Sequence, residues 1–204
     1  ALIRSIHTGD LRIIGIISNL GRDLSEGEIK QLETAEESIL DEQCYLQVIF
    51  KKTATLLSAC MEIGAISAGA TDEVISLCRS IGKNLGYCFQ IRDDIFDYFN
   101  EAQIGKPTGN DLREGKVTLP LLYALRQGGE EANRYRKMIL TKDFTEENIS
   151  ALISFAKKQG GIAYAEQRMQ EYYQAAIEQL QQLPKSAACQ SLLELADFIT
   201  KRKK

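Results

Sequence analysis

The sequence predicts an all-α protein, a bundle of mostly antiparallel helices. Apolar residues recur at mixed spacings of three and four along most of the chain, which is the period of an amphipathic helix. No segment shows the apolar–polar alternation of a half-buried strand. With 204 residues, of which 44% are hydrophobic, the chain can bury a sizeable core. We therefore expect residues 1–204 to form a single all-α domain.

The helices expected in the first half are long. Residues 10–38 carry apolar positions at helical spacing, and Ser25 with Glu28 matches a capping box that the helix can also run through. Residues 42–69 are rich in Ala, Ser, Gly and Cys and apolar on nearly every face, as in a helix at the centre of a bundle. A third helix is expected over residues 72–99, because Thr-Asp-Glu at its start supplies an N-cap and an acidic first turn.

The second half opens with a loop at IGKPTGND, residues 104–111, where two glycines and a proline break the helical period. Shorter helices are expected beyond this loop. N-capping residues mark the starts of two of them, Thr145 and Ser186. The expected ranges are 117–126, 145–158, 162–182 and 187–203.

The composition argues against several classes of function. A net charge of -3 disfavours nucleic acid as a partner, because that would require a basic face. No apolar run approaches membrane-spanning length and the opening residues lack the regions of a signal peptide, so we expect a cytoplasmic protein with no membrane span. Five scattered cysteines without a CxxC pair suit free thiols in a reducing compartment. His7 is the only histidine, which leaves almost no material for Ser-His-Asp or multi-histidine metal chemistry.

The segment FQIRDDIFDYFN, residues 89–100, places three carboxylates in an otherwise apolar helical stretch. On a helix, Asp93, Asp94 and Asp97 fall within one arc of about 100°, and Gln90 lies in the same arc. Carboxylates at i and i+4 repel one another and destabilise a helix by roughly a few tenths of a kcal/mol unless a cation lies between them. The stripe is therefore either an ordinary solvated face or a binding site for a hard cation such as Mg²⁺, which prefers oxygen ligands.

Three lysines accompany this stripe. Lys106 and Lys116 lie in and just after the loop that follows the aspartates, and Lys52 lies next to Thr53 in a mostly apolar helix. A buried charge there is costly unless it meets an opposite charge. Lysine is a point charge that binds phosphate, and magnesium bridges carboxylates to substrate phosphates. The pattern indicates a phosphate-bearing polyanion; the alternatives are ordinary loop lysines and a Lys52 side chain that extends to the surface.

These motifs in combination resemble a known family. FQIRDDIFDYFN followed by GKPTGNDLREGKVTLPLLYAL closely resembles the second aspartate-rich motif and the following loop of the trans-isoprenyl diphosphate synthases, which condense isopentenyl diphosphate with allylic diphosphates. The likeness covers nearly the whole chain. DDxxD is specific only together with the GKxTLP run. Three further segments look like the family's corresponding helices: LSEGEIKQLE (24–33), IFKKTATLL (49–57) and LPKSAACQSLLELADFITKRKK (183–204).

The resemblance implies a reaction, a cofactor and a set of site residues. In the family, Mg²⁺ draws the diphosphate off an allylic substrate, and the double bond of isopentenyl diphosphate attacks the resulting cation inside a central cavity of the bundle. It also implies a homodimer. The implied metal-facing carboxylates are Asp93 and Asp97, with Asp94 supporting them and Asp111 supporting the metal-bound water network. The implied catalytic residues are Lys52, Thr53, Gln90, Lys106 and Lys116, and the three lysines among them would contact the allylic diphosphate.

One departure from the family pattern shapes these expectations. The family carries two aspartate-rich motifs, and no DDxxD precedes residue 89 in this chain. We therefore expect the C-terminal part of a synthase with its N-terminal helices missing. The product, octaprenyl-like or shorter, stays open because the residues that set its length precede the first motif. Two alternatives also stay open: a non-catalytic, regulatory subunit of a heteromeric prenyl diphosphate synthase, and a class I terpene cyclase.

Overall fold

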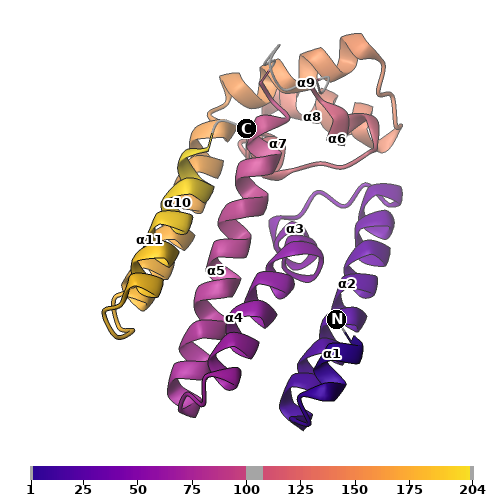
Figure 1. Ribbon diagram of the computed structural model, residues 1–204. Coiled ribbons are helices and arrows are strands. Elements are labelled where there is room, and N and C mark those ends of the chain that lie inside the picture. The colour runs from indigo at the N-terminus through magenta and orange to yellow at the C-terminus, as the bar shows by residue number, and fades with distance from the viewer. Residues whose placement is uncertain (1, 100–107, 203–204) are drawn as a thin grey trace. The chain divides into compact units, whose positions relative to one another are not determined.

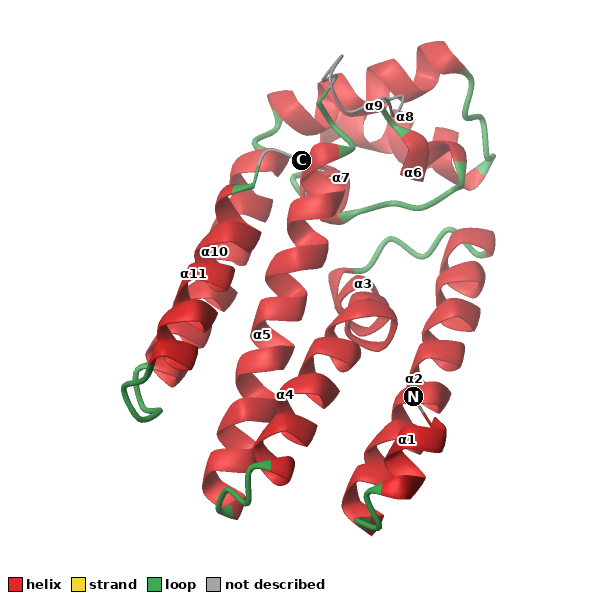
Figure 2. Cartoon of the chain, viewed as in Figure 1, coloured by secondary structure: helices red, strands yellow, loops and turns green. Residues whose placement is uncertain are grey.

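The computed structural model describes residues 2–99 and 108–202, and every regular element within these ranges is a helix (Figure 2). The prediction of an all-α protein is confirmed. Among the helices that the structure describes, none combines the length and the apolar character that a membrane span requires. In chain order (Figure 1) the elements are α1 (Leu2–His7), α2 (Leu11–Glu36), α3 (Glu42–Ile49), the π-helical turn η1 (Phe50–Ala54), α4 (Thr55–Ser67), α5 (Asp72–Phe96), α6 (Asn110–Arg113), α7 (Leu119–Arg126), α8 (Gly129–Leu140), α9 (Glu146–Lys158), α10 (Gly161–Leu180) and α11 (Ala187–Lys201).

The helices group into two compact units. Within the described residues, the first unit comprises residues 2–29, 48–90 and 170–202, and the second comprises residues 30–47, 91–99 and 108–169. Helices α2, α3, α5 and α10 each contribute to both units. That residues 1–204 behave as a single domain stays a prediction.

The first unit is held together by apolar packing and by tyrosines. Its core cluster draws on α2, α4 and α5, with Ile13, Ala65, Ile66, Ile75 and Cys78 buried at its centre. Farther along α5, the ring of Tyr87 stacks on the ring of Tyr172 of α10, with centroids 4.5 Å apart. Helix α11 in turn packs on α10, where the Tyr173 hydroxyl donates to the Asp197 carboxylate. These contacts fix the part of α5 that leads to Gln90.

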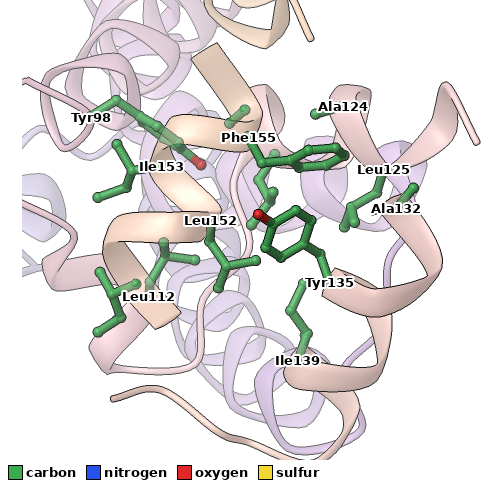
Figure 3. Close-up of a cluster of buried hydrophobic side chains, with 13 residues drawn as sticks. Tyr98, Leu112, Ala124, Leu125, Ala132, Tyr135, Ile139, Leu152, Ile153 and Phe155 are labelled. Atoms are coloured by element: carbon green, nitrogen blue, oxygen red, sulfur yellow. The ribbon is translucent and has the colours of Figure 1, made fainter. Parts of the chain in front are cut away.

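The second unit has its own core, built mainly from α7, α8 and α9 (Figure 3). The rings of Tyr135 and Phe155 lie in contact there, with centroids 4.5 Å apart. Tyr98 and Leu112 join the same cluster, so the chain immediately after α5 and the short helix α6 are both anchored in it. Tyr98 directly follows the aspartates at the end of α5, and Leu112 lies just before the loop that leads to α7. Anchoring these two residues in the core therefore holds the segments on which the predicted site residues lie.

Two predicted helices are confirmed in position but differ in detail. The expected helix 42–69 is interrupted at η1, since residues 50–54 form a π-helical turn rather than regular α-helix. The expected helix 72–99 ends at Phe96, because the last residues before position 100 form a turn. The helix over 10–38 runs as α2, and the Ser25 hydroxyl donates to the Gly21 carbonyl 3.0 Å away, so the helix does continue through the capping-box residues.

The helix ends of the second half follow the sequence closely. The Thr145 hydroxyl accepts a hydrogen bond from the Asn148 amide, and the Ser186 hydroxyl accepts one from the Cys189 amide. Both predicted N-caps are confirmed. Helix α8 was not predicted, because its sequence GEEANRYRKMIL is mostly polar and buries only Ala132, Tyr135 and Ile139 fully, with Met138 partly buried beside them.

Candidate functional site

The acidic stripe lies at the C-terminal end of α5, and its three aspartates meet different surroundings. Asp93 is exposed, Asp94 is only 5% exposed, and Asp97, one residue beyond the helix, is half-buried. Helical geometry places Gln90 on the same face, one turn before Asp93 and Asp94. An ordinary solvated face would expose all three carboxylates, and this one does not.

Asp94 owes its place to a tyrosine from another helix. The Tyr45 hydroxyl of α3 donates a hydrogen bond of 2.6 Å to the Asp94 carboxylate, and both residues are buried. Burial raises the pKa of Tyr45 well above its ordinary value, and the charge of Asp94 raises it further, so this hydroxyl keeps its proton and remains a donor. The pair fixes the Asp94 carboxylate and ties α3 to α5.

Asp97 holds the loop that follows the aspartates. Its two carboxylate oxygens accept hydrogen bonds from the backbone N–H groups of Asn110 and Asp111, at 2.9 and 3.1 Å, and its carbonyl accepts one from Gly109. Gly109 adopts φ 78°, a left-handed conformation that glycine takes without strain. Asp97 thereby caps the start of α6 and brings Asp111 next to the acidic stripe.

Burial disfavours the charged forms of two carboxylates at this loop, Asp97 and Asp111. Desolvation is the main cause that raises the pKa of Asp111 to about 6; the neighbouring charge of Asp97 contributes to the rise, and Lys116 opposes it. Desolvation also raises the pKa of Asp97, against the lowering effect of the two backbone N–H donors. The protein alone does not fully compensate these carboxylates, which is the electrostatic condition for attracting a cation.

Of the two predicted lysines that follow the stripe in the sequence, the structure describes Lys116. Lys116 lies in the same unit as Asp111: its backbone N–H donates to the Asp111 carbonyl at 2.8 Å, and its ammonium group pairs with Glu114. Glu114 is exposed and Lys116 is half-buried. Lys106 lies outside the described residues, so its predicted role stays a prediction.

The remaining predicted residues lie in the first unit, on and opposite η1. The Thr53 hydroxyl donates a hydrogen bond of 2.7 Å to the side-chain oxygen of Gln90, so the structure brings these two residues together. Lys52 forms an ion pair of 3.3 Å with Glu28 of α2, and about a third of its side chain is exposed. Lys52 therefore has an acidic neighbour and partial access to solvent, and its role in binding a diphosphate stays a prediction.

Two partners of the predicted residues, one in each unit, were not predicted. Glu28, named from the sequence only as a possible capping-box residue, is exposed on α2 and is the ion-pair partner of Lys52. Tyr45 gave no local signal, because its partner Asp94 lies 49 residues away in the sequence. A buried tyrosine hydroxyl usually has a hydrogen-bond partner. The position of Tyr45 in a mostly apolar helix was therefore the one feature of the sequence that indicated such a partner.

The donor set of the stripe suits magnesium. Within the part of the chain that the structure describes, no three or more His, Cys, Asp or Glu side chains are grouped so that they could hold a metal ion. Magnesium does not need such a group, because it is usually bound by one or two carboxylates together with substrate phosphates and waters. The exposed Asp93 and the half-buried Asp97, one helical turn apart, offer oxygen ligands of this kind.

Comparison with known proteins identifies the class. Residues 1–185 match the model of the polyprenyl synthetase family, and the chain belongs to this family. It is 34% identical over 187 residues to an octaprenyl diphosphate synthase of Haemophilus influenzae, a match that covers 91% of this chain and 57% of the relative. The chain thus spans a little over half the length of that relative.

Solved structures of the same class share the fold. A geranylgeranyl pyrophosphate synthase from Bacteroides thetaiotaomicron superposes with a TM-score of 0.91 at 40% identity, over 98% of this chain and 67% of that one. A polyprenyl synthase from Caulobacter crescentus, complexed with calcium and isoprenyl diphosphate, superposes with a TM-score of 0.89 at 32% identity, over 98% of this chain and 61% of that one. The prediction that the chain resembles the trans-isoprenyl diphosphate synthases is confirmed.

Proposed function

We propose that the protein carrying this chain is a prenyltransferase that condenses isopentenyl diphosphate with an allylic diphosphate to give a longer polyprenyl diphosphate. The observation that carries the proposal is the arrangement at the end of α5: one exposed aspartate, one buried aspartate, and a third, Asp97, that accepts hydrogen bonds from the backbone of the segment carrying Asp111 and Lys116. Membership of the polyprenyl synthetase family supports the reaction class.

In this proposal the residues of the chain act mainly by electrostatics. Lys52, Lys106 and Lys116 bind the diphosphate of the allylic substrate and stabilise the negative charge that grows on it as it leaves. Thr53 and Gln90, already joined by a hydrogen bond, present a polar pair beneath the reacting carbons. Apolar side chains of the helices around these residues exclude water, which would otherwise hydrate the allylic cation.

The cofactor in this proposal is Mg²⁺. Asp93 and Asp97 would hold it, Asp94 would be kept in place beside them by Tyr45, and Asp111 would support its water ligands. When bound, the metal supplies positive charge to the leaving diphosphate. The carboxylates contribute by staying ionised and fixed, which the hydrogen bonds to Asp94 and Asp97 favour.

We further propose a homodimer that acts in the cytoplasm on isopentenyl and allylic diphosphates. The five cysteines are all free thiols in the structure, which suits a reducing compartment. The family resemblance supports the dimer, and the product length stays open among octaprenyl and shorter chains.

The test is incorporation of labelled isopentenyl diphosphate by the protein expressed with its natural ends, with geranyl and farnesyl diphosphates as allylic substrates. The proposal predicts a longer, acid-labile prenyl diphosphate and dependence on magnesium. Release of a hydrocarbon without use of isopentenyl diphosphate would indicate a terpene cyclase instead. Activity only after addition of a second, catalytic subunit would indicate a regulatory subunit.

A further inference from the structure

The turn that carries Lys52 and Thr53 departs from regular α-helix. η1 (Phe50–Ala54) is π-helical, and it continues directly into α4. Turns of this kind are rare, and they occur frequently at functional sites because the extra residue changes where the side chains point. Such a turn needs support from its neighbours, and in the first unit that support comes from glycines on two other helices.

On one side, η1 meets Gly27 of α2. A Cβ atom at position 27 would lie 2.8 Å from the Lys51 Cβ and 2.9 Å from the Lys52 backbone nitrogen, closer than such atoms approach in proteins. The flanking residues of α2 hold the same two lysines, since Glu26 pairs with Lys51 and Glu28 pairs with Lys52. Glycine at position 27 therefore lets α2 lie directly against the backbone of η1.

On the other side, η1 meets Gly86 of α5. A Cβ atom at position 86 would lie 2.4 Å from the Ala54 Cα and 2.7 Å from the Ala54 Cβ. One helical turn farther along α5 lies Gln90, the hydrogen-bond partner of Thr53. The close approach at Gly86 thus sets the distance over which the Thr53–Gln90 hydrogen bond forms.

We propose that Gly27 and Gly86 are positioning residues, which hold η1 between α2 and α5 and so fix the directions of Lys52 and Thr53. Neither glycine would touch a substrate. Each acts through one residue: Gly27 through Lys52, whose backbone it contacts, and Gly86 through Thr53, next to Ala54. The importance of these directions for catalysis rests on the proposed function, whereas the close approaches are properties of the fold.

The chain offers matched control glycines on the neighbouring helices. Gly15 lies on α2, the helix of Gly27, and Gly64 lies on α4, which continues from η1; a Cβ atom at either position would meet nothing within 4 Å. Gly15→Ala and Gly64→Ala therefore make the same chemical change in helices without displacing a neighbour. Any general effect of replacing a helical glycine by alanine appears equally in these controls.

The first test measures binding of inorganic diphosphate with magnesium by calorimetry, below the melting temperature of each variant. Gly27→Ala should weaken binding about tenfold, the loss expected when one charge-assisted contact is misplaced. Gly15→Ala should leave the affinity unchanged. In a double-mutant cycle, Gly27→Ala combined with Lys52→Gln should bind no more weakly than Lys52→Gln alone, because both changes remove the same contact. Additive losses would contradict the role of Gly27.

The second test needs no ligand. The methyl resonance of Thr53 in a threonine-labelled NMR spectrum should shift in Gly86→Ala and stay in place in Gly64→Ala. An unshifted Thr53 resonance in Gly86→Ala, together with wild-type diphosphate affinity in Gly27→Ala, would overturn the inference. If the wild-type protein bound no diphosphate, the proposed function would fail, and the Thr53 resonance alone would still decide whether Gly86 positions η1.

Discussion

The two units hold their candidate residues by different means. In the second unit, Asp94 is buried under a tyrosine hydroxyl and Asp97 receives two backbone N–H groups, so both carboxylates are fixed by the fold. In the first unit, Lys52 is held by an ion pair with an exposed glutamate, an interaction of about 0–1 kcal/mol. The carboxylates are therefore placed before any ligand arrives, whereas the lysine can exchange one anionic partner for another.

The largest effect is expected at the exposed aspartate of the stripe. Asp93→Ala should lower the turnover number roughly 100-fold or more, as does loss of other groups that stabilise charge in a transition state. The KM for isopentenyl diphosphate should change much less. Steady-state kinetics over a magnesium series would measure both. Asp72→Asn, at the opposite end of α5, is the control; near-normal turnover of Asp93→Ala at saturating magnesium would rule out a metal role for Asp93.

The buried hydrogen bond between Tyr45 and Asp94 in the second unit should contribute to the free energy of unfolding. Tyr45→Phe removes only the hydroxyl that donates to Asp94 and leaves a buried carboxylate short of a donor, which should lower the free energy of unfolding by about 1–3 kcal/mol. Tyr135→Phe, in the apolar core of the same unit (Figure 3), should lower it less. Urea unfolding of the two variants makes the comparison, and equal losses would mean that the Tyr45 hydroxyl does not hold Asp94.

The exchangeable lysine of the first unit should matter for binding. Lys52→Gln should weaken binding of a bisphosphonate, a diphosphate mimic, about tenfold, and less at high salt, because a charge-assisted contact is lost. Lys51→Gln is the matched control, since Lys51 lies in the same turn and pairs with Glu26. Calorimetry at two salt concentrations would show the difference. Equal affinities of the two variants would mean that Lys52 does not bind the diphosphate and is an ordinary surface lysine.

The smallest effect is expected at the partner of that lysine. Glu28→Gln removes the carboxylate that competes with a diphosphate for Lys52, so bisphosphonate binding should tighten by at most a few fold, about the strength of an exposed ion pair. The same titration measures it. Weaker binding in Glu28→Gln would mean that Glu28 orients Lys52 instead of competing for it. Lys52 would then be held in place before a ligand binds, as the carboxylates of Asp94 and Asp97 are, and the contrast between the two units would be wrong.

The fold class and most helix ends could be predicted because they depend on local patterns. The caps at Thr145 and Ser186 are set by a side chain and a backbone N–H three residues away. The stripe of α5 follows from helical periodicity alone. Helix α8 was missed, since only three of its residues are fully buried in the core.

The details of the site could not be predicted, because they depend on contacts between distant segments. The pairs Tyr45–Asp94 and Glu28–Lys52 join residues on different helices. The π-helical turn lies in close contact with Gly27 of α2, a residue more than 20 positions away in the sequence. The roles of Thr53, Gln90 and Asp111 entered through the family resemblance; the structure places Thr53 beside Gln90 and Asp111 beside Asp97, and their functions stay predictions.

The central claim is that the carboxylates of Asp93 and Asp97, at the C-terminal end of α5, bind a metal, and that the metal and the lysines together bind a diphosphate. The most direct measurement is calorimetric titration of inorganic diphosphate into the 204-residue chain, with magnesium present and with magnesium removed by EDTA. The claim predicts binding at least about tenfold tighter with magnesium, since the metal adds a charge-assisted contact that the lysines alone do not supply. Equal affinity under both conditions would contradict it.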